Sequence, residues 1–298
     1  LTASNIAVTE VVGAVMKPEA RVAGDGLLAA CQGAMSILSG SYDLVLIVAH
    51  GKASMGERWA ISSWAFDPIY QQPLGLDDLS AAALQAATYL ERHRLLPDVL
   101  ARAATRPAGP TTAEILASPP VASPLRELEI TPPADGACAL VLAAENLARS
   151  ASREPIWIRG MGFALEEHYL GDRDLAHPTA LREAARRAYE LAGISEPKAQ
   201  IEVAEISDPF AHQRLLWAEA LGFCPPGRGV ETLTALEGPV LNASGGLLRG
   251  VPPFVAGLDR LLEVLAHLRQ NPGLGLAQGC WGPAGQGQVV VIVESERS

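Results

Sequence analysis

Aromatic and basic side chains are both scarce in this sequence of 298 residues. Phenylalanine, tryptophan and tyrosine together make up 5% of the chain, and 23 lysines and arginines face 33 aspartates and glutamates. The resulting net charge of −10 argues against broad contact with the phosphate backbone of nucleic acid. We therefore expect no nucleic-acid partner, although one or two basic residues would be enough for a local anion site.

Cysteine is also rare, and the four cysteines never form a CxxC pair. They are Cys31, Cys138, Cys224 and Cys280. A zinc site or a redox motif of paired cysteines is therefore not visible. Five histidines also lack ligand spacing: His50, His93, His168, His177 and His267. We expect no metal site, and a reduced, cytoplasmic protein.

Long apolar runs and targeting signals are missing as well. No apolar run reaches the ~18 residues that a membrane-spanning helix needs, and no signal peptide is visible. We therefore expect no membrane span. The chain is nevertheless 49% hydrophobic and 19% charged, which is typical of a well-packed globular protein. Alanine, leucine and valine supply most of the core, which suits closely packed layers of helices and strands.

The most informative stretch is Arg21–Gly40, with the sequence RVAGDGLLAACQGAMSILSG. Two glycines surround Asp25, a residue type that commonly caps helix N-termini. The apolar residues that follow recur close to every 3.6 positions, which predicts a helix that ends at Gly40. Such a loop points backbone N–H groups at whatever lies above it, so it could bind an anion or hold a nucleophile. The alternative is a tight turn that binds nothing.

Strands and helices alternate along the rest of the chain. Strands are expected at Asn5–Val15, Asp43–Ala49, Gly136–Ala143, Ile156–Phe163, Gln200–Ile206, Pro239–Leu241, Leu274–Cys280 and Gln288–Glu294. Helices are expected at Leu79–His93, Thr179–Ala192, from the end of Ile206 through Leu221, and at Phe254–Leu268. This alternation favours largely parallel sheets covered by helices. We expect two similar halves, residues 1–150 with a loop excursion at 50–125, and residues 151–298.

Four motifs in order resemble the thiolase superfamily. RVAGDGLLAA, beginning at Arg21, is similar to the family's nucleophile loop R-V-C-G-S-G-L-Q-A. The stretches Thr131–Ala148, Asn242–Gly250 and Gly275–Glu294 resemble its P-x-x-D-G-A-A-A-V-V-L strand, its N-x-S-G-G-x-x-x-G loop and its C-terminal hairpin. GFCPPGRG at Gly222–Gly229 suggests the sterol-carrier-protein, or lipid-transfer, type. The resemblance implies an α/β thiolase fold in which two similar halves pack as a five-layer α-β-α-β-α sandwich.

The same resemblance implies that most of the catalytic set is replaced. The acyl-accepting cysteine corresponds to Ala23, and the histidine that activates it corresponds to Val251. The asparagine or histidine of the family's N-E-A-F or H-D-x-F motif corresponds to Ser207. Only Cys280 remains, at the position of the cysteine that shuttles a proton in thiolases. It could keep this acid–base role, or be a small core residue left from an ancestor.

Asp208 and His212 are the other candidates for chemistry. They lie four residues apart at a strand end and a helix start, so the two side chains could pair as a general base. The alternative is that Asp208 or Ser207 caps the helix. By resemblance, the catalytic cavity is lined by residues from two loops, namely Ala23, Gly24, Asp25, Ser207, Asn242, Ser244, Gly245 and Val251.

Several functions remain open from the sequence. One is an enzyme that binds a coenzyme A thioester as substrate and breaks a carbon–carbon bond by retro-aldol cleavage, with Cys280 as acid or base. The family's aldolases use tyrosines, and none occurs at Ser207 or Cys280. Another is a non-catalytic thiolase-like subunit, and a third is an acetyl-CoA acetyltransferase that uses other residues. The resemblance further implies a homodimer and, as partner, a small OB-fold protein with a zinc ribbon.

Overall fold

The computed structural model describes residues 9–152, 154–234 and 237–296. Its largest sheet has five strands in the order β5-β9-β8-β6-β7. These strands are β5 (Ile156–Leu165), β6 (Val203–Ile206), β7 (Val240–Leu241), β8 (Leu274–Trp281) and β9 (Gly287–Ser295). β8 and β7 run parallel to β6, whereas β9 runs antiparallel to both of its neighbours, β5 and β8. The sheet is therefore mixed, and the expectation of largely parallel sheets is wrong.

Helices cover both faces of this sheet. The C-terminal helices are α7 (Glu145–Ala151), α8 (Thr179–Ala192), α9 (Pro197–Gln200), α10 (Ala211–Ala220) and α11 (Ala256–Leu268). α8 packs on β5 and β9, and α11 packs on β8 and β6. The strands are apolar on both sides because both faces are buried: Val289 through Val293 of β9 are each at most 1% exposed.

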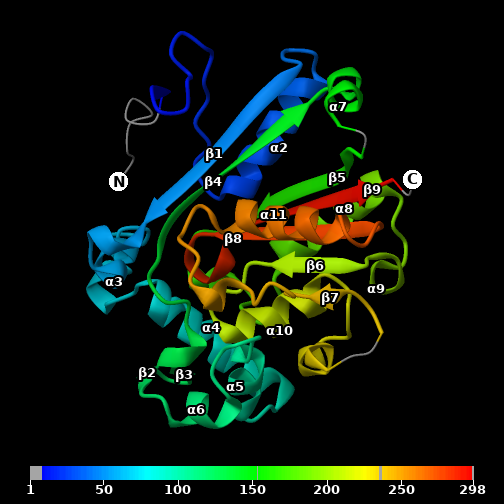
Figure 1. The fold of residues 1–298 in the computed structure, drawn as a ribbon. Helices are drawn as coiled ribbons and strands as arrows, with labels where there is room; N and C mark the ends of the chain where they lie inside the picture. The colour runs from blue at the N-terminus through cyan, green and yellow to red at the C-terminus, as the bar shows by residue number, and fades with distance from the viewer. Residues whose placement is uncertain (1–8, 153, 235–236, 297–298) are drawn as a thin grey trace.

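The N-terminal part is built from one helix and one pair of strands. Helix α2 (Gly26–Leu38) leads into β1 (Leu44–Lys52), which pairs antiparallel with β4 (Asp135–Ala143). The register is continuous along all nine residue pairs. Side chains alternate across this pair, so that Ile47 and Ala49 are buried toward α2, whereas Leu44 and Leu46 are exposed. Figure 1 shows α2 and α11 between this pair and the five-stranded sheet.

The segment between β1 and β4 is mostly helical. It contains α3 (Arg58–Ser63), α4 (Asp78–His93), α5 (Asp98–Ala104), α6 (Thr112–Ala117) and a hairpin of β2 (Pro120–Ala122) and β3 (Leu125–Arg126). Alanine-rich faces of α4 and α5 are buried in one large core with α8 and α10. A second core joins α2 and α11 with the inner faces of both sheets. Short 3₁₀ turns complete the chain at Ala53–Met55, Gln72–Leu74, Glu127–Glu129, Leu170–Asp172, Gly229–Leu233, Leu247–Arg249 and Pro283–Gly285.

The predicted strand at Asn5–Val15 is wrong where the structure describes it. Residues 5–8 lie outside the described residues, and Thr9–Val15 forms turns in which the Ala14 N–H donates to the Thr9 carbonyl at 2.8 Å. This local bonding uses groups that a sheet ladder would need. The other predicted strands and helices are confirmed within two residues at nearly every end. Within the described residues, no helix has the length and apolarity to cross a membrane.

Candidate active site

The loop before α2 is held by Asp25, as its residue type predicts. One carboxylate oxygen, Oδ1, accepts the Leu27 N–H at 2.8 Å and so caps α2. The other, Oδ2, accepts the Gly257 N–H at 2.9 Å, in the first turn of α11. The carboxylate is 3% exposed, and burial raises its pKa to about 6, against the opposing effect of these two hydrogen bonds. The space above both helix N-termini is therefore occupied by a carboxylate of the chain itself.

The tip of this loop carries no reactive group. Ala23 is exposed, and Gly24 adopts a φ of 137° that disfavours any side chain. A methyl group on Gly24 would lie 3.3 Å from the Trp281 ring. Trp281 follows Cys280 at the end of β8, so the two loops meet here as the family resemblance implies.

Cys280 reaches the expected place but has no base beside it. Its Sγ lies 3.8 Å from the carbonyl oxygen of Ser207, with no imidazole or amine among its printed hydrogen-bond partners. Burial raises the pKa of the thiol well above its usual range, and the carboxylates of Asp25, Asp208 and Asp78 raise it further. The thiol is therefore protonated at neutral pH and is a poor nucleophile.

Ser207 is a fully buried part of the sheet edge. Its N–H donates to Oε1 of Gln278 at 2.8 Å, and its Oγ donates to the Gln278 carbonyl at 3.0 Å. The Ser207 carbonyl also accepts the indole N–H of Trp217 at 2.9 Å. Both groups of the hydroxyl's surroundings are backbone or amide, so Ser207 has no partner that could activate it as a nucleophile.

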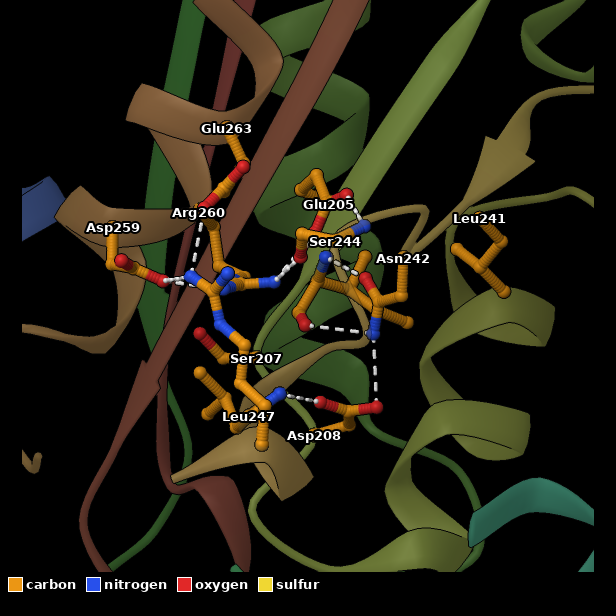
Figure 2. Close-up of polar contacts among 12 residues, drawn as sticks. Glu205, Ser207, Asp208, Leu241, Asn242, Ser244, Leu247, Asp259, Arg260 and Glu263 are labelled. Atoms are coloured by element: carbon orange, nitrogen blue, oxygen red, sulfur yellow. Dashed lines mark hydrogen bonds and ion pairs between the residues drawn. The ribbon is translucent and has the colours of Figure 1, made fainter. Parts of the chain in front are cut away.

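Asp208 holds the loop that follows β7 (Figure 2). Its Oδ2 accepts Nδ2 of Asn242 at 2.9 Å, and its Oδ1 accepts the Leu247 N–H at 2.7 Å. Burial raises the pKa of this carboxyl, whereas Arg214 and the two hydrogen bonds lower it. The alternative that Asp208 or Ser207 caps α10 is wrong, because Phe210 is the N-cap residue and no side chain caps that helix.

A buried ion pair supports the same loop from below. Glu205 accepts the backbone N–H of Ser244 at 2.9 Å and its hydroxyl at 2.7 Å, and it pairs with Arg260 of α11 at 2.5 Å. Arg260 is fully buried and also contacts Asp259. Asn242, Ser244 and Gly245 are thus fixed by carboxylates rather than left free for a substrate, and this ion pair was missed in the sequence. The 3.6-residue period of α11, with buried Ala256 and Val264 on either side of Arg260, was the available signal.

The predicted pair of His212 with Asp208 does not form. His212 is fully buried on α10, where Nε2 lies 3.0 Å from Oε1 of Gln85 and Nδ1 has no partner. Burial lowers the pKa of the imidazole to about 3, so it is neutral. The helix begins at Ala211, after Asp208, so the two residues do not share a helical face and the i, i+4 argument fails.

Val251 lies in an apolar environment. It is 7% exposed and packs with Leu247 and Ala256. On its outer side, a hollow of about 230 Å³ is lined by residues of β4, the loop around Val251 and α11. No imidazole is available here to activate a thiol.

Two charged residues of the helical segment approach the site and were not predicted. Arg58 donates to the Thr131 carbonyl at 2.6 Å and stacks on Trp59, with its guanidinium carbon 4.5 Å from the ring centre. Burial raises the pKa of Asp78 to about 6, while Arg58 lowers it. Among the described residues, no group of three or more His, Cys, Asp or Glu side chains could hold a metal ion.

Comparisons with known proteins agree with this geometry. Residues 163–293 match the family model "Thiolase C-terminal domain-like". The acetyl-CoA acetyltransferase of Methanothermobacter thermautotrophicus is 29% identical over 283 residues, which cover 88% of this chain and 73% of the relative. That of Methanocaldococcus jannaschii is 30% identical over 272 residues, 83% of this chain and 69% of the relative.

The chain belongs to the thiolase superfamily. Sterol carrier protein 2 of Bos taurus is 31% identical over 172 residues, 54% of this chain and 31% of the relative, in agreement with the sterol-carrier type. Among solved structures, one titled "Ltp2-ChsH2(DUF35) aldolase" superposes with a TM-score of 0.79 at 21% identity, over all of this chain and 85% of that one. The predicted thiolase fold is confirmed, and the protein is a thiolase-like, acyl-CoA-related protein.

This thiolase-like protein brings together the loops that the family resemblance assigns to its cavity. The loop at Gly24 meets Trp281, Cys280 meets Ser207, and Asp208 meets Asn242. What the described residues do not bring together is a thiol and a base. The sequence could indicate the loops, but the way their polar groups satisfy one another needed the structure.

Proposed function

We propose that this thiolase-like protein binds a coenzyme A thioester without forming an acyl-enzyme, and that it acts as a non-catalytic subunit. The observation that carries the proposal is the absence of a thiol–imidazole pair among the described residues of the site. The nucleophile position is Ala23, Val251 is buried among apolar side chains, and Cys280 has a raised pKa and no base. Thiolysis divided into two steps needs a thiolate that can accept the acyl group.

The remaining polar groups of the site support binding rather than chemistry. Arg106 lies beside the Asn242–Gly246 loop, where its Cβ is 3.9 Å from the position of a methyl group on Gly245. It is attracted by Asp208, while burial lowers the pKa of its guanidinium. Arg58 supplies a second, partly buried cation. Two such cations provide a local attraction for phosphate or thioester oxygens despite the net charge of −10.

Retro-aldol cleavage of a β-hydroxyacyl-CoA is the second candidate, favoured by the position of Cys280 at the sheet edge. In that reaction the β-hydroxyl loses its proton, the Cα–Cβ bond breaks to give a carbonyl compound, and the resulting enolate takes a proton at Cα. A protonated Cys280 thiol could supply that last proton. No described group with a matching position is set to take the first one, so binding without turnover is the stronger proposal.

A partner protein would account for retention of the fold without the catalytic set. The solved structure with a TM-score of 0.79 is titled as a complex of Ltp2 with ChsH2(DUF35). We infer that the partner of this protein is a small OB-fold protein with a zinc ribbon, and that both are cytoplasmic. In this arrangement residues 1–150 and 151–298 are the two thiolase halves.

Calorimetric titration with CoA and acetoacetyl-CoA tests the proposal. We expect micromolar binding of acetoacetyl-CoA, weakened about tenfold by Arg106→Ala, the loss of one charge-assisted contact. Arg92→Ala is the matched control, because Arg92 is a surface arginine paired with Asp174 at 2.7 Å, on the helical segment. Absence of binding up to millimolar ligand would contradict the proposal and direct attention to the partner alone.

A further inference from the structure

The two central helix–strand units of the fold are copies of each other. Helix α2 and helix α11 both have 13 residues, and each is followed after the same interval by a strand, β1 at Leu44 and β8 at Leu274. Each strand then pairs antiparallel with a later one, β4 or β9. In this correspondence Leu46 matches Leu276, and their cross-strand partners Val141 and Ile292 match as well.

The matching positions differ strongly in exposure. Leu276 and Ile292 are 0% exposed, whereas Leu46 is 48% and Val141 57% exposed. In the C-terminal unit, β8 is paired on its second edge with β6. Among the residues that the structure describes, β1 pairs only with β4, so its second edge has no strand beside it.

This open edge lacks the features that usually prevent association. Natural edge strands carry internal charges, prolines or bulges, or are covered. The segment Leu44–Ala49, LVLIVA, has no charge, proline or glycine, and its register with β4 has no bulge. A long, regular and apolar edge of this kind is a pairing surface for another strand.

The charges at the two ends of β1 identify the strand that fits. Asp43 immediately precedes β1, and Lys52 is its last residue, so the ends have opposite charge. Antiparallel pairing with an identical strand brings the negative end of one copy next to the positive end of the other. A two-fold axis also requires this antiparallel arrangement. Parallel pairing would instead place like charges together.

We propose that a second copy of this chain pairs with the free edge of β1, giving a two-fold dimer with a continuous four-stranded sheet β4-β1-β1-β4. Pairing all nine residues of β1 places its central residue, Val48, on the two-fold axis. Val48 is half-buried and faces the small Ala139 across the β4 ladder. Its side chain in one copy then lies opposite the same side chain in the other, at a separation of about 5 Å between Cβ atoms.

Charge swapping at position 48 tests this interface. In sedimentation-equilibrium experiments over a concentration series, the wild type is expected to be dimeric, and Val48→Lys and Val48→Glu are each expected to weaken dimerisation at least tenfold. An equimolar mixture of these two variants should recover dimers, because opposite charges then face each other on the axis. Recovery cannot be explained by a folding defect of either variant.

Val141→Lys is the matched control, since Val141 is exposed on the same face but belongs to β4. We expect it to leave the dimer unchanged. A monomeric wild type, a dimer insensitive to both Val48 variants, or a mixture that stays monomeric would overturn the proposal. These outcomes are independent of CoA binding, so a failure here is distinguishable from a failure of the proposed function.

Discussion

Asp25 and Gly257 connect the N-termini of the two central helices through one carboxylate. Oδ2 of Asp25 accepts the Gly257 N–H at 2.9 Å while Oδ1 caps α2. The close approach depends on glycine, because a methyl group on Gly257 would overlap with Oδ1 and one on Gly279 would lie 2.6 Å from it. The pair of helices that in this fold faces the reacting group is thus closed by an internal anion.

This buried carboxylate should make stability depend on pH. Its pKa is raised from 3.8 to about 6 in the folded protein. Between these values the folded state binds more protons than the unfolded state, so stability falls as pH rises from about 4 to 6, by up to about 3 kcal/mol. We expect Asp25→Ser, which keeps a capping hydroxyl, to remove this part of the slope. Urea unfolding of both proteins from pH 4 to 7 measures the difference; parallel curves would contradict it.

Removal of Arg260 should be strongly destabilising. Arg260→Met leaves Glu205 buried without its cation, and we expect a loss of about 3–5 kcal/mol in the free energy of unfolding. The double variant Glu205→Leu/Arg260→Met removes both charges and should lose less than Arg260→Met alone. Denaturant unfolding of the three proteins decides the point. Additive losses would show that the two side chains act independently.

Restoring the two family residues should not restore acyl transfer. In Ala23→Cys/Val251→His, the thiol is exposed, whereas the imidazole replaces a side chain packed against Leu247 and Ala256. Burial keeps such an imidazole neutral and disfavours the ion pair with a thiolate. We expect no thiolysis of acetoacetyl-CoA, measured by loss of the substrate's absorbance. Ala23→Cys alone, checked by circular dichroism, is the control for folding. Thiolysis by the double variant would reveal a site that lost activity only through these substitutions.

The sequence predicted the fold because its signals are local. The cap at Asp25, the period of α2 and the apolar run of β1 depend on neighbouring residues, and the four motifs occur in the family's order. The strand predicted at 5–15 failed because apolar alternation alone does not provide a pairing partner. The mixed direction of the main sheet also depends on connections far apart in the chain.

The candidate site was only partly predictable. The residues at the loop tips could be assigned by resemblance, but the partners of His212 and Asp208 come from positions far away, Gln85 on α4 and Leu247 after β7. Spacing of four residues indicated a His212–Asp208 pair only on the assumption that both lie in one helix. The buried ion pair of Glu205 with Arg260 joins residues 55 apart, and no local pattern could indicate it.

The central claim is that no cysteine of this protein carries an acyl group during its encounter with a CoA thioester. Intact-protein mass spectrometry after incubation with saturating acetoacetyl-CoA, quenched in acid, measures this directly. We predict that the protein keeps its unmodified mass. An added acetyl or acetoacetyl group that maps to Cys280 would contradict the account and show that this thiol is a nucleophile after all.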